Sequence, residues 1–456
     1  MFHSISTQHF PHRSSLIYPM NDLPSILKYI FEKTTHNQTG TVADYIPQLA
    51  TVDPDQYGMA FCDIHGKLTC QGDATTDFCL QSCSKPLTYC LARCLQSRQE
   101  TCIVHAHVGY EPSGRPFNEF VLNRDGLPHN PLINAGAVMV ASMVHPNDEP
   151  ANRFETVLDF YRKMSGNHGK IGFDNSVFLS EKHHADRNTS LAYYMRENNA
   201  YDGTPTPSQL SDHLDLYFQA CSITANCEVC AVIASTIAND GVCPVNGERV
   251  VDASIVKDVK AIMYGCGMYD FSGQFGFCVG LPAKSGVSGC VMLVIPNVGG
   301  LCVWSPRLDV MGNSVRGIEF CLEFSQQTES RFHLFSNTNS SEESLFQVIQ
   351  YASNGDVQQL GAIEDNTLFG ASDYDGRTPM HLACSEAQVD VITFLMTKPG
   401  VRTDVKDRWG YTPLDELVRH AERLRQKEPT TETTELITRL DSCIAHMRTD
   451  HTPEST

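Results

Sequence analysis

The chain is poor in basic residues. Its 456 residues include 34 Lys and Arg against 53 Asp and Glu, which gives a formal net charge of -19 at pH 7. Affinity for nucleic acids comes mainly from clustered Lys and Arg, and no basic run is present. The longest apolar stretch, residues 291–304, is interrupted by Pro296-Asn297 and Gly299-Gly300, whereas a membrane-spanning helix needs about 20 apolar residues. We therefore expect no nucleic-acid partner and no membrane partner.

A metal-binding cysteine pattern is also lacking. The 18 cysteines are spread along the chain, which is more typical of a protein in a reducing compartment than of a secreted disulfide framework. Only one C-x-x-C occurs, Cys227 to Cys230, and a structural zinc site usually needs two. The surrounding residues are small and apolar with helical spacing, so we predict buried free thiols in a core helix. Two histidine pairs, at 105–107 and 183–184, lack matching ligands, and no metal is expected.

The first twenty residues resemble a targeting segment only in part. They contain no acidic residue and several Ser and His, but Arg13 is their one fixed positive charge. Transit peptides are Ser-rich and acid-poor but also Arg-rich. Because a continuous apolar segment is lacking, secretion is not expected.

Changes in composition divide the chain into five segments. They are a polar lead-in with one helical stretch (1–44), a domain rich in Gly, Cys and Ala (45–324), a Ser- and Asn-rich linker (325–343), a repeat region (344–425) and a polar tail (426–456). Residues 289–303 form two apolar β-runs joined by Pro-Asn-Val-Gly-Gly, which predicts a hairpin. Helical spacing with Ala and Cys fills residues 215–238. Helices before a closing antiparallel hairpin indicate an α+β domain.

An internal repeat follows the linker. Gly376 and Thr378 recur as Gly410 and Thr412, both 34 residues later, and each Thr precedes a Pro that can start a helix. A period of about 33 with a T-P-L-H-x-A signature resembles the ankyrin repeat, a turn with two helices. A degenerate earlier copy is expected over residues 345–360. We therefore predict an all-α ankyrin-repeat domain in which His381 has a structural role.

Ser82 and Lys85 form the sharpest candidate for chemistry. Serine needs a base in contact to act as a nucleophile, and a Lys three residues later on a helix lies on the same face. Burial among apolar neighbours lowers the pKa of a Lys and makes it a base. Pro86 is tolerated only in the first turn of a helix, so Ser82 is expected at or just before a helix N-terminus.

S-x-x-K alone is a weak signal, because it also occurs at residues 25–28 and 254–257. Only Ser82 to Lys85 is followed, about 200 residues later, by Lys284-Ser285-Gly286 leading into an apolar β-run. In serine β-lactamases and penicillin-binding proteins, S-x-x-K pairs with a K-[ST]-G triad on a strand that lines the same cleft. This pairing favours a serine hydrolase.

A longer series of ordered motifs resembles the glutaminase family, whose catalytic domain has the β-lactamase-like fold. The matching blocks are residues 45–50, 78–87, 108–114, 128–137, 180–188, 217–222, 266–273 and 280–287. Ankyrin-like repeats after the domain resemble the animal kidney-type and liver-type glutaminases rather than the shorter bacterial enzymes. The resemblance implies an α+β, β-lactamase/penicillin-binding-protein-like catalytic domain followed by an all-α ankyrin-repeat domain.

The resemblance also implies residue roles. Ser82 would attack the side-chain amide of glutamine, Lys85 would take its proton, and Tyr269 would relay a proton to the departing ammonia. Tyr45 would bind substrate and help the relay, and the backbone N–H groups of Ser82 and Val287 would form the oxyanion hole. The residues that would recognise the amino acid are Asn134, Glu181, Asn188 and Tyr217. Read locally, without the resemblance, Tyr217 is a core residue and Glu181 belongs to a solvated charged turn. Asn134 is then a helix-start or turn residue, and Tyr269 closes a loop.

Two classes of function remain open on the sequence. An active glutaminase would convert L-glutamine and water to L-glutamate and ammonia without a cofactor, with phosphate as an expected activator. An ankyrin scaffold with a dead catalytic domain would have lost its nucleophile or base, and both are present. A related amidase is disfavoured by the groups for a free amino acid. By the resemblance we expect a homo-oligomer, dimer or tetramer, in the mitochondrial matrix, with the cytoplasm as the alternative. The ankyrin partner is unnamed.

The loop at residues 114–120 corresponds by the resemblance to one that joins dimers and couples phosphate to activity. Pro116 stiffens this loop and Glu119 adds a negative charge, so an altered phosphate response is expected.

Overall fold

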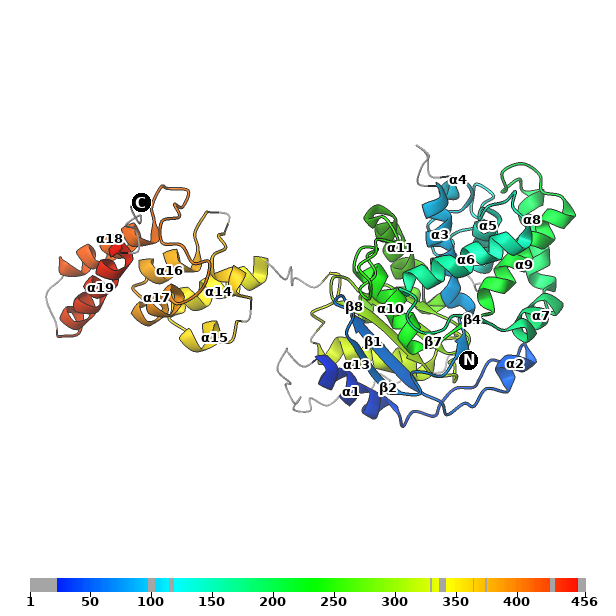
Figure 1. Ribbon diagram of the computed structural model, residues 1–456, viewed down its shortest axis with the longest axis horizontal. Helices are drawn as coiled ribbons and strands as arrows, with labels where there is room; N and C mark the ends of the chain where they lie inside the picture. Colours follow the sequence, from blue (N-terminus) through cyan, green and yellow to red (C-terminus); the bar gives the residue numbers. More distant parts are fainter. Residues whose placement is uncertain are drawn as a thin grey trace, which may run out of the picture. The chain divides into compact units, whose positions relative to one another are not determined.

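The computed structural model of the protein describes residues 23–96, 103–114, 119–328, 330–335, 342–363, 365–373, 375–426 and 431–449. They belong to two compact units, divided between Phe335 and Ser336 (Figure 1). The targeting-like segment 1–20, Pro116 and the end of the polar tail lie outside the described residues.

A five-stranded antiparallel sheet forms the centre of the first unit. Its strand order is β2-β1-β8-β7-β6. The strands are β1 (Gly58–Asp63), β2 (Leu68–Gly72), β6 (Ala283–Ser285), β7 (Cys290–Ile295) and β8 (Gly299–Trp304). The expected hairpin is confirmed as β7 and β8, which turn at Asn297 in a left-handed conformation. Both strands are buried throughout, as in a sheet covered on both faces.

Helices cover the two faces of this sheet (Figure 1). Helix α10 (Cys227–Ala238) packs on β8, β1 and β7. Its backbone comes so close to β8 that a Cβ added to Gly300 would lie 2.2 Å from the Ser235 nitrogen. On the other face lie α1 (Leu23–Thr34) and α13 (Val315–Gln327), which share an apolar cluster with the sheet. The absence of a side chain at Gly300 therefore permits the close contact between α10 and β8.

A second layer of helices lies beside the sheet. It consists of α3 (Ser84–Gln96), α4 (Val104–His107), α5 (Asn134–Ser142), α6 (Pro150–Met164), α7 (Asn175–His183), α8 (Asp186–Glu197), α9 (Pro207–Cys221), α11 (Ala253–Cys266) and α12 (Ser272–Cys278). Shorter elements are α2 (Pro47–Ala50), η1 (Gln81–Cys83), η2 (Tyr269–Phe271) and a small sheet of β3 (Phe78–Cys79), β5 (Ile223–Ala225) and β4 (Gly172–Phe173). The unit is thus a mixed α+β domain, as predicted.

The helical pattern of residues 215–238 is two helices rather than one. Strand β5 separates α9 from α10, because Ile223 pairs with Phe173 and Ala225 pairs with Phe78. Asn226 then starts α10 by accepting a hydrogen bond from the Val229 nitrogen. The continuous apolar spacing conceals this break, since the strand residues are as buried as the helix faces.

The domain boundaries at 44 and 324 were wrong. Helix α1 lies before residue 44, yet Leu27 and Ile30 are fully buried in the same cluster as the sheet. At the other end α13 continues to Gln327 and the unit to Phe335. These end segments belong to the domain because their apolar faces complete its core.

The second unit is helical over its described residues. Its elements are α14 (Glu342–Asn354), α15 (Val357–Gly361), η3 (Asn366–Phe369), α16 (Pro379–Ser385), α17 (Val389–Met396), α18 (Pro413–Arg425) and α19 (Thr431–Thr449). Helix α19 buries Leu440 and Met447 in the core of this unit. The tail predicted from residue 426 therefore contains a helix of the folded unit.

The sequence repeat is also a structural repeat. Asp373 and Asp407 each accept hydrogen bonds from backbone N–H groups two and four residues later. Thr378 and Thr412 each cap the following helix in a reciprocal capping box. His381 Nε2 lies 3.2 Å from the Tyr411 carbonyl oxygen, which joins one turn to the next. His381 thus has structural contacts, as expected.

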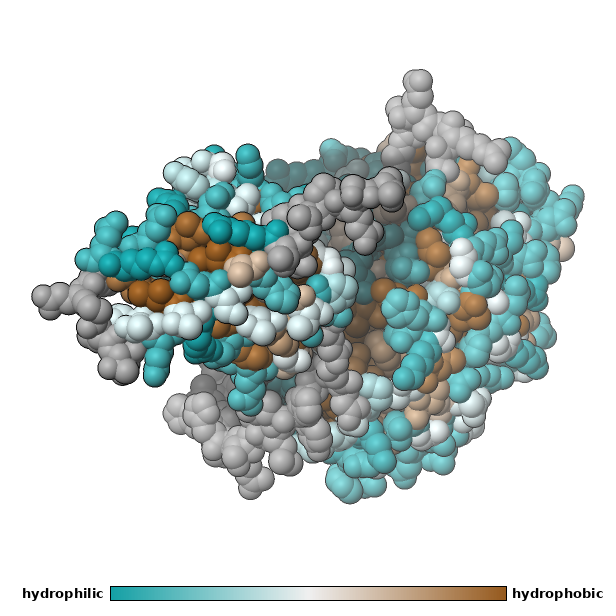
Figure 2. Space-filling model, turned by 60° about the vertical axis from the view of Figure 1, so that its left-hand side comes forward, coloured by the Kyte–Doolittle hydropathy of each residue, from teal (hydrophilic) through white to brown (hydrophobic). Residues whose placement is uncertain are grey.

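No helix in the described part of the chain is long and apolar enough to cross a membrane. Hydrophilic residues cover much of the face shown in Figure 2, with hydrophobic patches between them.

Candidate active site

Ser82 lies in the short helix η1, which leads directly into α3. Strand β3 precedes it, and the Leu80 nitrogen donates to the Ile223 carbonyl. Gln81 has a positive φ of 48°, a costly conformation for a residue with a side chain. Ser82 is 8 % exposed. The predicted position just before a helix N-terminus is confirmed, and a strained turn here is typical of a functional site.

Lys85 is buried on the first turn of α3. Its Nζ donates to Asn134 Oδ1 at 2.7 Å, and Asn134 Nδ2 donates to Asn188 Oδ1 at 3.0 Å. Burial lowers the pKa of Lys85 from 10.5 to about 8, because the charged ammonium loses its hydration. A fraction of Lys85 is therefore in the neutral amine form, which a base requires, near neutral pH.

Tyr269 faces Ser82 from η2. Burial raises the pKa of its phenol, and the neighbouring Ser82 side chain acts in the opposite direction. Like Gln81, Tyr269 has a positive φ, here 54°. Its phenol therefore stays protonated and can pass a proton to or from the Ser82 oxygen.

A second lysine lies behind Tyr269. Lys284 Nζ is 4.3 Å from the centre of the Tyr269 ring and donates to the Gly267 carbonyl at 3.0 Å. Burial, with a smaller contribution from the Lys85 charge, lowers the pKa of Lys284 to about 7. The K-S-G triad drew attention to this strand, but our site prediction omitted Lys284. Its contact with the phenol marks it as a residue that positions Tyr269.

Tyr45, Glu181 and Gln81 form a second group. The Tyr45 hydroxyl donates to Glu181 Oε1 at 2.6 Å, and Gln81 Nε2 donates to the same oxygen at 3.1 Å. The Tyr45 ring is 46 % exposed although its hydroxyl end is enclosed. Burial raises the pKa of Glu181, so this carboxylate would gain from a cationic partner. Gln81 was missed from the sequence because a glutamine before a serine has no distinctive pattern.

Tyr217 and Val287 complete the predicted set. The Tyr217 ring centre lies 5.8 Å from Lys85 Nζ, and burial raises the pKa of its phenol. Val287 is half-buried beyond β6 and packs with a small apolar cluster that includes Ile46 and Cys79. The structure thus links Ser82 with Tyr269, Lys85 with Asn134, Asn188 and Tyr217, and Tyr45 with Glu181.

Gly286 permits the close approach of this strand to the nucleophile turn. A Cβ at Gly286 would lie 2.9 Å from the Leu80 carbonyl oxygen and 3.2 Å from Cys83 Sγ. We expect Gly286→Ala to reduce kcat by at least about tenfold, because the strand must shift and a small misplacement of reacting groups is costly. Steady-state kinetics would measure this loss. Gly265→Ala is the matched control, since nothing lies within 4 Å of its added Cβ. Equal kinetics of the two variants would contradict the expectation.

The mixed α+β fold and the buried Ser–Lys pair are compatible with a hydrolase in which a serine acts beside a lysine. Residues 40–335 match the family model for Glutaminase. The chain belongs to the glutaminase family of glutamine amidohydrolases.

Two animal relatives and one solved structure support this assignment. The chain is 45 % identical over 402 residues to putative glutaminase 3 of Caenorhabditis elegans, covering 85 % of this chain and 67 % of the relative. It is 42 % identical to the mitochondrial liver isoform of glutaminase from Rattus norvegicus, covering 85 % and 66 %. The structure of Mglu in its L-glutamate binding form has a TM-score of 0.62 and 31 % identity, covering 70 % of this chain and 71 % of that one. The chain spans about two thirds of the length of these animal relatives.

Proposed function

We propose that this chain hydrolyses L-glutamine to L-glutamate and ammonia through an acyl-enzyme on Ser82. The observation that carries the proposal is the placement of Ser82 directly before the helix whose first turn holds buried Lys85, whose pKa is lowered to about 8, with the buried Tyr269 phenol near Ser82. The reaction needs no cofactor, since the residues supply the nucleophile, the base and the acid.

The first half-reaction forms the ester. Neutral Lys85 takes the Ser82 proton as the hydroxyl oxygen attacks the side-chain amide carbon of glutamine. Tyr269 donates a proton to the amide nitrogen as the C–N bond breaks, and the Lys85 ammonium restores that proton. Ammonia leaves, and water then attacks the ester by the reverse proton path to release glutamate. The backbone N–H groups of Ser82 and Val287 stabilise the oxyanion.

Recognition of the free amino acid uses the two hydrogen-bonded groups. Glu181 is a buried carboxylate and binds the α-ammonium of the substrate, with Tyr45 holding it in place. Asn134, Asn188 and Tyr217 bind the α-carboxylate and the amide. The L-glutamate binding form of Mglu supports an amino acid ligand of this type.

The test is the release of glutamate and ammonia by the purified full chain given glutamine, with asparagine as the matched substrate one methylene shorter. We expect glutamate from glutamine and little aspartate from asparagine. No release from folded protein, with or without phosphate, would overturn the proposal in favour of a scaffold.

Removal of the Glu181 charge is expected to weaken substrate binding. Glu181→Gln keeps an oxygen that can accept from Tyr45 but loses the charge that pairs with the ammonium. A hydrogen bond to a charged group contributes about 1.5–3 kcal/mol, so KM should rise by about 10- to 100-fold with a smaller change in kcat. As pH falls, protonation of Glu181 removes the charge that binds the ammonium, and the wild-type KM should rise. Because the pKa of Glu181 is raised, this rise should begin at a higher pH than it would for an ordinary carboxyl. Glu155→Gln, on the exposed face of α6, is the control, and an unchanged KM in Glu181→Gln would contradict the assignment.

We further propose that the second unit is an ankyrin-repeat domain that contacts a protein partner. The repeated Asp turns and Thr-Pro helix starts support it.

The mitochondrial liver isoform among the relatives supports a mitochondrial location, with the cytoplasm as the alternative. A homodimer or homotetramer and activation by phosphate complete the proposal. Sedimentation of the full chain tests the assembly, and glutamate release measured with and without phosphate tests the activation.

A further inference from the structure

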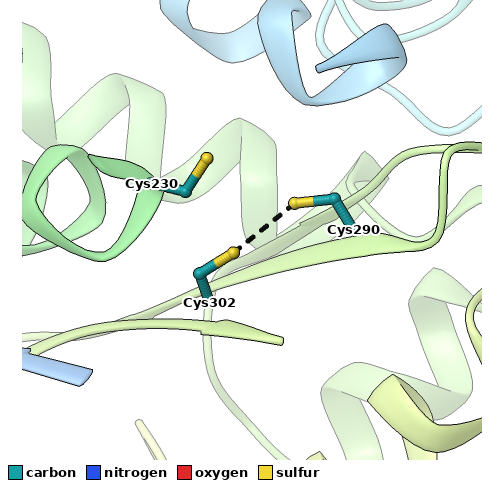
Figure 3. Close-up of side chains that lie close together, drawn as sticks. All are labelled: Cys230, Cys290 and Cys302. Carbon is teal, nitrogen blue, oxygen red and sulfur yellow. Dashed lines mark hydrogen bonds between the residues drawn. The ribbon is translucent and has the colours of Figure 1, made fainter. Parts of the chain in front are cut away.

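Three cysteines far apart in the sequence meet beneath the active site. Cys230 comes from α10, Cys290 from β7 and Cys302 from β8, and all three are fully buried. The Cys290 and Cys302 sulfurs point toward each other, and the Cys230 sulfur lies beside them (Figure 3). The sulfurs of Cys290 and Cys302 are 3.6 Å apart, and all three lie within 4.8 Å of one another. The arrangement is a triangle of thiols in a rigid part of the core.

This triangle has the dimensions of a three-coordinate metal site. A metal–sulfur bond is about 2.3 Å long, so an ion at the centre of a planar triangle separates its sulfur ligands by about 4 Å. The Cys290 and Cys302 sulfurs, 3.6 Å apart, are slightly closer than that value, and all three sulfurs lie within 4.8 Å of one another. Small rotations of side chains would therefore complete the site without movement of the backbone elements.

We propose that Cys230, Cys290 and Cys302 bind one Cu(I) ion in a three-sulfur site. Soft thiolate ligands favour Cu(I), Zn(II) and iron–sulfur clusters, and of these Cu(I) accepts three ligands. Structural Zn(II) sites instead take four tetrahedral ligands, and among the residues described no fourth His, Cys, Asp or Glu joins this group. Binding releases thiol protons to solvent and changes no oxidation state. The Lys284 ammonium lies close enough to Cys290 for their charges to interact, which offsets part of the negative charge.

The site would be continuous with the catalytic strands. Cys83, the residue after the nucleophile, points its sulfur at the Cys290 carbonyl at 3.6 Å and at the Lys284 carbonyl at 3.4 Å. A bound ion would tie α10, β7 and β8 together directly under this turn. We therefore expect copper to raise the melting temperature of the loaded protein.

The experiment uses the full, reduced chain incubated without oxygen with Cu(I) supplied as its acetonitrile complex. Excess bathocuproine disulfonate then removes copper from the more accessible thiols. We expect about one copper retained per wild-type chain and three sulfur neighbours in its X-ray absorption spectrum, as a three-thiolate site requires. Cys230→Ser should lose this copper. Cys321→Ser, a fully buried cysteine of the other core cluster, is the matched control and should keep it.

The X-ray absorption spectrum of the wild-type protein counts the sulfur ligands directly, so this part of the test does not depend on whether a variant folds. Cys302→Ala provides a second variant. Retention of no copper by the wild type would overturn the proposal. So would equal retention by folded Cys230→Ser, or a spectrum with two sulfur neighbours. Zn(II) bound as firmly as Cu(I) would overturn the choice of ion.

Discussion

Ser82→Ala is expected to lower kcat by about 10⁵-fold or more, which is the size of loss seen when a covalent nucleophile is removed. The other serine of this turn, Ser84, donates its hydroxyl proton to the Gln81 carbonyl at 2.7 Å, and we do not expect it to form the ester. The variant should remain folded, because Ser82 is a small side chain whose loss leaves little unfilled volume. Coupled measurement of glutamate release, with circular dichroism for folding, checks both parts.

The chain contains its own matched control for this variant. Ser254 begins another S-x-x-K sequence but is exposed on α11. Ser254→Ala should therefore have wild-type kinetics. If Ser82→Ala retained more than a few per cent of the activity, the acyl-enzyme mechanism would be wrong. Detection by mass spectrometry of an acyl adduct on the wild-type protein, and not on Ser82→Ala, would support the acyl-enzyme mechanism.

Replacement of Lys85 should have the second largest effect. Lys85→Met keeps much of the side-chain volume and removes the base, and general-base catalysis contributes about 10²–10⁴-fold. We therefore expect a loss in kcat of about 10³-fold. In the wild type, activity should rise with pH through about 8, the lowered pKa of Lys85, because only the neutral amine can accept the proton. In Lys85→Met this rise should be absent.

Stability distinguishes a lost base from a damaged fold. Burial lowers the pKa of Lys85 in the folded chain from 10.5 to about 8, so between these values the unfolded chain binds the proton more tightly. The free energy of unfolding therefore falls as pH decreases through this window, and below it the full destabilisation remains. Lys85→Met removes the penalty and should be at least as stable as wild type at pH 7. Lys257→Met, at the exposed S-x-x-K of α11, is the control. A destabilised Lys85→Met protein would show that the buried amine holds the fold.

Part of the site was predictable because its signals are local. The spacing of Ser82 and Lys85 places both on one helix start, and Pro86 confines that start to one position. The hairpin of β7 and β8 was predicted because its turn residues separate two apolar runs. The break between α9 and α10 was missed, since β5 is buried and apolar like the helices around it.

Contacts between distant segments escaped prediction. Helix α1 was assigned to a lead-in because the spacing of its residues predicts a helix but does not indicate that the helix packs on the sheet. Gln81 has no distinctive motif, and only its bond to Glu181, one hundred residues away, gives it a role. The pKa of Lys284 depends on burial and on the Lys85 charge, and neither follows from its neighbours in sequence.

The sequence by itself indicated the candidate nucleophile and base, the repeat of the second unit and the family resemblance. Each of these depends on residue spacing within one short segment or on the order of several segments. Only the tertiary structure decided which of 18 cysteines meet. Cys230 belongs to the one C-x-x-C, whereas its nearest partners are not Cys227 but Cys290 and Cys302. The physical reason is packing: α10 lies across the hairpin at Gly300, and that contact brings sulfurs from three elements to one point.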